Sequence, residues 1–206
     1  MEKSLYYFHK LKTRFCIYGL GSTGMSVLNY FERKNFEKYK AWDDSKALRD
    51  FYGFKFPYKG YEFSKIFDLT DYIVLSPGIS LKKAKLKKKL IENKDKIITD
   101  LDLFYLFNPK IKTIVVTGTN GKSTTCKILE HVLKKKNINV RLGGNIGKPV
   151  LDLDLKNYPV VIIEASSFQL AYSKFIRPDY AVILNITNDH LDWHGSNKKY
   201  VNSKLK

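Results

Sequence analysis

The stretch at residues 111–125, IKTIVVTGTNGKSTT, constrains the fold of this chain more than any other segment. Three consecutive β-branched residues at 114–116 predict a buried strand. A turn containing two glycines follows, and a helical pattern begins at Lys122. A strand, a glycine-rich turn and a Lys-Ser pair at the start of a helix are the layout of a phosphate-binding loop. The segment therefore predicts an α/β fold with an anion site at one end of a strand.

The chemistry of such a loop follows from its backbone and from two side chains. Glycines allow backbone N–H groups to face an anion, and the helix N-terminus adds partial positive charge. Lys122 is predicted to reach the outer phosphates, and Ser123 to place its hydroxyl on Mg²⁺. The common pattern GxxxxGK[ST] requires glycine where this chain has Val116, so the loop from Gly118 is two residues shorter. A glycine-rich turn without a ligand is the alternative, and the Gly-Lys-Ser sequence between strand and helix disfavours it.

A second glycine motif opens the first half of the chain. Gly19, Gly21 and Gly24 have the GxGxxG spacing between a predicted strand at 15–18 and a predicted helix at 25–31. A further strand at 40–42 ends at Asp43, about 20 residues beyond the loop, where dinucleotide-binding folds place an acidic residue on a ribose. The motif predicts a nucleotide-like ligand without specifying NAD.

The rest of the first half completes a small α/β unit. A strand at 71–75 ends in Ser-Pro-Gly-Ile at 76–79, at the strand end where open sheets bind ligands; a plain turn is the alternative for Ser-Pro-Gly. A helix over 82–93, a short strand at 96–99 and an apolar segment at 101–107 follow. Asn108 and Pro109 break the pattern, and we place a domain boundary near Pro109 and Lys110.

In the second half, a helix is expected at 124–136 and strands at 139–142, 160–163 and 180–186. The strand at 160–163 is almost continuously apolar, as in a parallel sheet, and the strand at 180–186 is expected to be buried. Glu164 ends the second of these strands, beside the phosphate loop, where a Mg²⁺ ligand is expected; a helix N-terminal acid is the alternative. His190 and His194 have i, i+4 spacing, but Leu191 replaces the glutamate of a zinc protease. A hard-metal site using His190 or Asp189 is the better hypothesis.

Charge and cysteine content narrow the class of protein. The 37 basic and 20 acidic residues give +17, which suits nucleic acid or a phosphate-rich substrate. The densest lysine run, at 81–89, keeps leucines at 81, 86 and 90, so it resembles the solvated face of an amphipathic helix. Cys16 and Cys126 are predicted to be buried thiols without a disulfide. The polar N-terminus and the lack of a run of about 18 apolar residues predict a soluble, cytoplasmic protein without membrane insertion.

Taken together, these motifs resemble the Mur ligases of peptidoglycan synthesis. The resemblance rests on VTGTNGKSTT at 116–125, GGNIG at 143–147, EASSFQL at 164–170 and NITNDHLDWHG at 185–195, and the short loop is the family's usual form. GLGSTGMS at 19–26 and SPGI at 76–79 fit the first domain of these enzymes, which binds a uridine nucleotide. EASSFQL is similar to the branch of the family that adds D-glutamate. The likeness runs from about residue 14 to the end of the sequence.

The resemblance implies a fold and an activity. The fold is α/β, with a small Rossmann-like UDP-substrate-binding domain at 1–109 and a partial P-loop-type parallel-sheet ATP-binding domain at 110–206. The family's C-terminal glutamate-binding domain has no counterpart in this sequence, so we expect a truncated or split ligase. The implied reaction uses ATP and Mg²⁺ to phosphorylate the carboxylate of UDP-N-acetylmuramoyl-L-alanine, and D-glutamate then displaces phosphate from the acyl phosphate. We expect a monomer that binds no nucleic acid.

The resemblance also implies roles for individual residues. The implied ATP-binding residues are Gly118, Thr119, Asn120, Gly121, Lys122, Ser123 and Thr124. The implied metal ligands are Ser123, Glu164, His190 and Lys204, the last as a carbamate, and the implied catalytic residues are Lys122, His190 and Lys204. The implied substrate-binding residues are Ser22, Thr23, Asp43, Gly78 and Asn145. Without the resemblance, the lysines near the end of the sequence would be predicted to be solvated. Lys198 and Lys199 are the weaker candidates for the carbamylated position. Lys204 is preferred because Tyr200 fits the family's tyrosine just upstream of that position.

Two other classes remain as alternatives. An NAD-linked oxidoreductase would use the GxGxxG motif and Asp43, but no hydride-transfer constellation follows it in the sequence. A nucleic-acid-binding module would use the positive charge, and its affinity would fall steeply with salt. A folate-polyglutamylating ligase shares the ATP loop and is disfavoured by the GxGxxG motif in the first domain.

Overall fold

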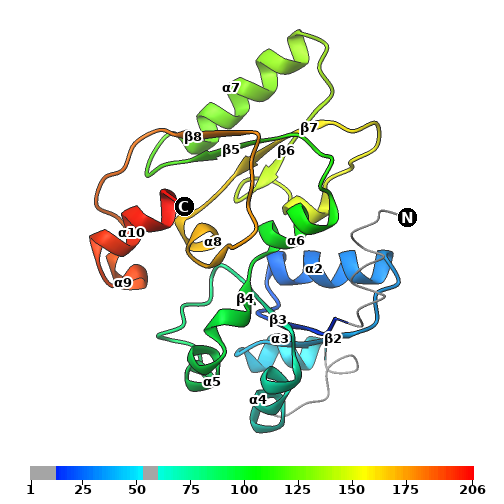
Figure 1. The fold of residues 1–206 in the computed structure, drawn as a ribbon, viewed down its shortest axis with the longest axis vertical. Helices are drawn as coiled ribbons and strands as arrows, with labels where there is room; N and C mark the ends of the chain where they lie inside the picture. Colours follow the sequence, from blue (N-terminus) through cyan, green and yellow to red (C-terminus); the bar gives the residue numbers. More distant parts are fainter. Residues whose placement is uncertain (1–12, 53–59) are drawn as a thin grey trace.

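The computed structural model describes residues 13–52 and 60–206, which form two parallel β-sheets flanked by helices (Figure 1). The first sheet has the order β2-β1-β3-β4, and the second has the order β6-β7-β5-β8. Every strand pairing within these two sheets is parallel. The prediction of an α/β protein with parallel sheets is therefore confirmed.

The first sheet contains β1 (Phe15–Tyr18), β2 (Tyr39–Trp42), β3 (Tyr72–Leu75) and β4 (Ile97–Ile98). Its helices are α2 (Ser22–Arg33), α3 (Lys46–Phe51), α4 (Gly60–Leu69) and α5 (Lys87–Glu92), with a 3₁₀ turn, η1 (Lys94–Lys96). The strands are short and apolar, as expected where helices cover both faces of a sheet. Helix α6 (Asp100–Phe107) then leads from the first sheet to the second.

The second sheet contains β5 (Thr113–Thr117), β6 (Val140–Gly144), β7 (Val160–Glu164) and β8 (Tyr180–Ile183). Helix α7 (Lys122–Lys135) follows β5, and the 3₁₀ turn η2 (Val150–Asp152) follows β6. Helices α8 (Ser167–Tyr172), α9 (Leu191–His194) and α10 (Asn197–Lys204) gather on one side of this sheet (Figure 1).

One apolar cluster joins the two sheets. It contains Phe15 and Ile17 of β1 together with Val161 and Ile163 of β7. Helix α6 contributes Phe104, which is fully buried in the same cluster. Because removing such side chains from water is the main force that stabilises folds, the two sheets are held against each other by a common core.

The predicted helix over 82–93 is wrong in its first half. Only α5 is helical there, because the backbone N–H groups that a longer helix would need are bonded elsewhere. Lys85 N donates to Asp44 Oδ2 at 2.8 Å, and Leu86 N donates to the Tyr18 hydroxyl at 3.4 Å. Leu90 is buried, as the amphipathic pattern predicts, and the tertiary contacts override the helical pattern before it.

Two other expectations near the end of the chain need correction. The buried strand predicted at 180–186 ends at Ile183 and is largely exposed, since β8 lies at the edge of its sheet; Tyr180 is 67% exposed. Residues 198–206 are also more structured than solvated lysines would be. They contribute to α10, which begins after Ser196, whose hydroxyl accepts a hydrogen bond from Lys199 N. Lys206 Nζ donates to the carbonyl of Ala171 at 2.7 Å.

The cysteine prediction is confirmed, since Cys16 and Cys126 are both free and buried. Burial raises the pKa of both thiols, and the pKa of Cys126 reaches about 12, with the nearby Glu164 carboxylate as the second cause. None of the helices within residues 13–52 and 60–206 combines the length and apolarity that crossing a bilayer requires.

Candidate functional site

The phosphate-loop sequence forms the turn between β5 and α7, in the strand–turn–helix context that the motif requires. Gly118 has φ +154° and Gly121, the residue before the helix, has φ +82°, backbone conformations that side-chain-bearing residues avoid. The loop is fixed from the opposite side by Asn185, whose carbonyl accepts from Thr119 N at 2.9 Å and whose side chain accepts from Asn120 N at 2.9 Å. The loop is therefore held in one conformation.

Lys122 folds back over this loop. Its Nζ donates to the carbonyl of Gly118 at 2.8 Å and to the carbonyl of Thr119 at 2.7 Å. The ammonium group thus lies at the mouth of the turn, within reach of an anion bound there. An ammonium has three donors, and these two bonds leave one for a ligand.

Glu164 connects the phosphate loop to a neighbouring strand end. It lies at the end of β7, in register with Val116 of β5, and is 2% exposed. Its Oε2 accepts from Ser123 Oγ at 2.7 Å, and its Oε1 accepts from Asn145 Nδ2 at 2.8 Å. Three residues predicted to act at the site are thus joined in one hydrogen-bonded chain. Hydroxyl and carboxylate oxygens are the donors that Mg²⁺ prefers, so Ser123 and Glu164 fit that ion chemically.

Lys204 of α10 reaches the same loop from the other side. It is 5% exposed, and its Nζ donates to the Gly118 carbonyl at 2.9 Å and to Thr117 Oγ1 at 3.3 Å. Burial, and then the positive charge of Lys122, lower the pKa of Lys204 to about 8. Tyr200, one turn earlier, shares a 2.8 Å hydrogen bond between its hydroxyl and Thr119 Oγ1. Helix α10 is thereby attached to the loop at two points.

The two predicted histidines lie in different environments. The His190 ring is about half exposed and pairs with Asp189, Nε2 to Oδ2, at 3.4 Å. His194 is buried, and its Nε2 lies 3.0 Å from Ser167 Oγ. Burial, followed by the charges of His190 and Lys204, lowers the pKa of His194. Within the described ranges, no group of three or more His, Cys, Asp or Glu residues is arranged to hold a metal ion.

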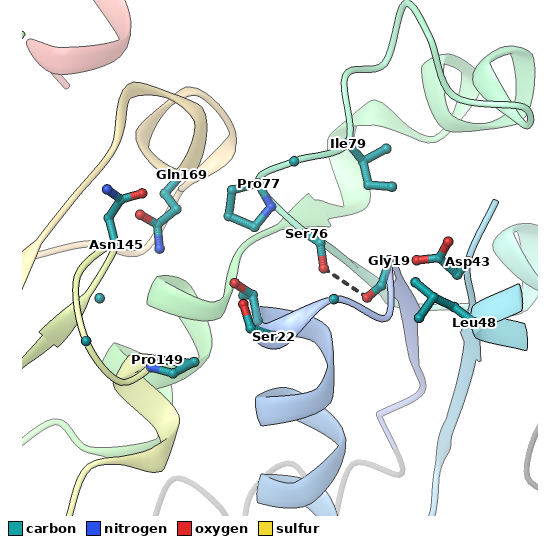
Figure 2. A pocket seen from close by; sticks show the side chains of 15 residues that line it. Gly19, Ser22, Asp43, Leu48, Ser76, Pro77, Ile79, Asn145, Pro149 and Gln169 are labelled. Carbon is teal, nitrogen blue, oxygen red and sulfur yellow. Dashed lines mark hydrogen bonds between the residues drawn. The ribbon is translucent and has the colours of Figure 1, made fainter. Parts of the chain in front are cut away.

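A cleft of about 440 Å³ lies between the two sheets (Figure 2). The glycine-rich turn after β1 and the turn after β3 form one wall, and the loop after β6 forms the other. All five predicted substrate-binding residues line it: Ser22, Thr23, Asp43, Gly78 and Asn145. In Figure 2, Asn145 and Gln169 lie on one side of the cleft, while Ser22 and Asp43 lie on the other. A ligand in the cleft would contact both halves of the chain.

The wall formed by the first half depends on close backbone packing. A Cβ at Gly24 would lie 1.7 Å from the carbonyl oxygen of Gly19, so only glycine fits there. Ser76 Oγ donates to that same carbonyl at 2.9 Å, which ties the turn after β3 to the glycine-rich turn. The Asp43 carboxylate accepts from Leu20 N at 2.6 Å with Oδ2 and from Ser45 N at 2.7 Å with Oδ1. Asp43 therefore shapes the turn as well as lining the cleft.

Gln169 and Asp100 were not predicted from the sequence. Gln169 lines the cleft, and its Oε1 accepts from the backbone N and the hydroxyl of Ser166, each at 3.1 Å. Its Nε2 donates to the carboxylate of Asp100 at 3.3 and 3.4 Å. Asp100 is 1% exposed, and burial raises its pKa to about 6. The Ser-x-x-Gln capping box at 166–169 is the sequence signal that could have located Gln169.

Comparisons with known proteins agree over both halves. Residues 13–99 match the family model described as "Mur ligase MurD-like, N-terminal domain", and residues 116–206 match "Mur ligase middle domain". UDP-N-acetylmuramoylalanine–D-glutamate ligase of Wolbachia pipientis wMel is 39% identical over 198 residues, covering 92% of this chain and 38% of that protein. The protein of the same name from Francisella tularensis (strain WY96-3418) is 36% identical over 205 residues, covering 97% and 45%.

A solved structure shows the same fold. It is the UDP-N-acetylmuramate:L-alanyl-gamma-D-glutamyl-meso-diaminopimelate ligase from Neisseria meningitides, with a TM-score of 0.52 and 16% identity, covering 93% of this chain and 66% of that one. The chain spans less than half the length of the curated relatives named above. The two family models follow one another along the chain and together match most of its residues. This chain therefore belongs to the Mur ligase family.

Proposed function

We propose that this chain carries the nucleotide-substrate and ATP sites of a ligase that joins D-glutamate to UDP-N-acetylmuramoyl-L-alanine. The observation that carries the proposal is the bridge at Glu164, which bonds Ser123 of the phosphate loop and Asn145 of the cleft. A reaction between the γ-phosphate of ATP and a carboxylate of a second substrate needs both sites side by side. The relatives' names supply the identity of that substrate.

The cleft is proposed to hold the uridine nucleotide substrate. Ser22 and Thr23 lie in the first turn of α2, where a helix N-terminus favours the charge of a diphosphate. Gly78, on the turn after β3, carries no side chain that would fill the cleft, and a Cβ there would meet nothing within 4 Å. Asp43 holds the turn that faces the uridine part of the substrate. Asn145 contacts the muramoyl part, on the side of the cleft nearest to Glu164.

The phosphate loop is proposed to bind MgATP. Thr119 N and Asn120 N are bonded to Asn185, so the backbone N–H groups over 121–124, at the start of α7, face the phosphates. Lys122 transfers its donors from the loop carbonyls to phosphate oxygens. Ser123 and Glu164 would hold Mg²⁺, which neutralises charge on the phosphates when bound. This set needs no cluster of histidines or cysteines. A Lys122→Ala chain should therefore lose ATP binding and keep the substrate cleft intact.

Lys204 is proposed to be carbamylated and to provide a further metal ligand, together with His190. Carbamate formation joins Nζ of a neutral amine to the carbon of CO₂ and releases a proton. With a pKa of about 8, Lys204 is neutral far more often at pH 7.5 than an ordinary lysine. Lys198 and Lys199 are exposed, so neither has the buried position next to the loop that Lys204 has. The carbamate would replace a buried cation with an anion beside the phosphate loop.

The proposed reaction is an attack of the substrate carboxylate on the γ-phosphorus of ATP, followed by attack of the D-glutamate amine on the acyl phosphate and loss of phosphate. This chain's residues bind and orient the first two reactants and balance their charge. The setting is peptidoglycan synthesis in the cytoplasm, where it serves wall growth, cell shape and division. We propose a monomer, without nucleic acid or membrane insertion.

The test is calorimetric binding by the chain as it stands, combined with phosphate release in the presence of UDP-N-acetylmuramoyl-L-alanine, ATP, Mg²⁺ and D-glutamate. Lys122→Ala should weaken ATP binding at least about 100-fold and abolish any phosphate release. Lys127→Ala, an exposed residue on the same helix, is the matched control and should change neither. Asn145→Ala should weaken binding of the uridine substrate and leave ATP binding unchanged. ATP binding that survives in Lys122→Ala, or NADH binding in place of the uridine substrate, would overturn the proposal.

A further inference from the structure

A second cavity, of about 390 Å³, lies outside the cleft and shares no lining residue with it. Its walls come from the turn after β3, the end of α8, and helices α9 and α10. The three helices lie on one side of the second sheet (Figure 1). The cavity thus lies at a junction of the two halves of the chain. Neither the phosphate loop nor the substrate cleft uses it.

The charge of this cavity has one sign. Three lysines line it, Lys82 from the turn after β3 and Lys199 and Lys206 from the end of the chain, and no aspartate or glutamate is among the lining residues. The nearby Asp192 pairs at 3.8 Å with Lys83, which does not line the cavity. Lys206 Nζ uses one of its three donors on the Ala171 carbonyl. The Asp102 carboxylate, outside the lining, attracts Lys206, so the positive charge of the cavity is partly offset, and the cavity still gathers three ammonium groups.

An aromatic wall adjoins these lysines. The rings of Tyr172 and Trp193 both line the cavity, with their centroids 5.5 Å apart. Leu81 completes this apolar side, and its backbone bonds to the Tyr172 hydroxyl, which fixes the ring. Lysines facing a phosphate and an aromatic wall facing a ring are the two elements of a site for an organic phosphate.

We propose that this cavity binds a small organic phosphate, with its phosphate oxygens on Lys82, Lys199 and Lys206 and its apolar ring against Tyr172 and Trp193. A dianion fits better than a monocarboxylate, because the cavity is lined by three ammonium groups and by no aspartate or glutamate. The ligand would contact the turn after β3 and α10 together. Inorganic phosphate satisfies only the charged half of this site.

Trp193 provides the readout. The chain has two tryptophans, so Trp42→Phe leaves Trp193 as the one tryptophan whose emission can report binding. Phenyl phosphate should change that emission with a dissociation constant below about 10 mM, and inorganic phosphate should bind several-fold more weakly. Lys82→Ala and Lys199→Ala, each added to Trp42→Phe, should each weaken phenyl phosphate about fivefold or more.

Two controls separate this cavity from the rest of the molecule. Lys122→Ala removes the loop lysine and should leave the phenyl phosphate titration unchanged, as should Lys127→Ala on the exposed face of α7. Circular dichroism confirms that each variant is folded. The proposal is overturned if Lys122→Ala abolishes the titration, if Lys82→Ala and Lys199→Ala leave it intact, or if inorganic phosphate binds as tightly as phenyl phosphate.

Discussion

Asp100 is a buried carboxylate whose charge should destabilise the fold at neutral pH, and its removal should reveal this cost. It is 1% exposed, and burial raises its pKa from the ordinary 3.8 to about 6, against the stabilising effect of its hydrogen bonds from Gln169 and the backbone. The nearby Asp102 carboxylate adds to the increase. We predict that Asp100→Asn stabilises the chain at pH 7.5, because the amide has no charge to bury.

The magnitude follows from linkage between protonation and folding. Between pH 3.8 and about 6 the folded chain binds a proton at Asp100 that the unfolded chain has already released, so stability falls as pH rises through this window. A shift of about two pKa units corresponds to about 3 kcal/mol, the upper limit of the penalty at pH 7.5. The gain on Asp100→Asn should therefore be about 1–3 kcal/mol at pH 7.5 and should disappear near pH 4, where the native carboxyl is already neutral.

Urea unfolding of both chains at pH 7.5, 5.5 and 4 measures this difference. The same variant should bind UDP-N-acetylmuramoyl-L-alanine about three- to tenfold more weakly, since Gln169 Nε2 loses a charged acceptor that orients its amide in the cleft. Ser173→Ala, which removes a neighbouring hydroxyl bonded to Thr99, is a control without that pH dependence. A destabilised Asp100→Asn chain at pH 7.5, or a gain that does not shrink toward pH 4, would refute the reasoning.

Three further outcomes follow from the packing. Gly24→Ala should cost about 2 kcal/mol or more in thermal unfolding, because its Cβ meets the Gly19 carbonyl, whereas Gly21→Ala, with nothing within 4 Å, should cost less than about 1 kcal/mol. Cys126 should react with a thiol reagent only in denaturant, and fast reaction of the native chain would contradict its burial. Arg33→Ala should lower the free energy of unfolding by about 1 kcal/mol, since Arg33 donates to the Leu151 carbonyl at 2.8 Å. Lys34→Ala is the control, and an equal loss of stability in that variant would show that the effect comes from surface charge.

The sequence predicts those parts of the fold that local pattern determines. Apolar β-branched runs locate the strands, and the glycine turns after β1 and β5 lie where the motifs require them. Prediction fails where backbone N–H groups donate hydrogen bonds to side chains far away in the sequence. The N–H groups of Lys85 and Leu86 bond to Asp44 and Tyr18, so the expected helix begins only at Lys87. No local pattern encodes a partner more than 40 residues away.

The candidate site was likewise predictable only in part. The motifs name Lys122, Ser123, Glu164 and Asn145, and the structure brings them within hydrogen-bonding distance of one another or of the same loop. They do not indicate how Gln169 is held, because Asp100 belongs to another helix and its effect depends on burial. The exposed strand β8 is a further case. Its composition predicts burial, but burial also depends on which strands and helices lie next to it.

The two glycines that end β6 explain how one carboxylate can serve two sites. A Cβ at Gly143 would lie 2.7 Å from the Lys148 carbonyl, and one at Gly144, with φ +107°, would lie 2.4 Å from the Glu164 carbonyl. Only glycines allow this close approach, and it lets Asn145 N donate to that same carbonyl at 2.8 Å. The Asn145 side chain then reaches Oε1 of Glu164, which leaves Oε2 for Ser123. A larger residue at 144 should therefore weaken binding of both the uridine substrate and ATP, whereas Asn145→Ala should weaken binding of the uridine substrate alone.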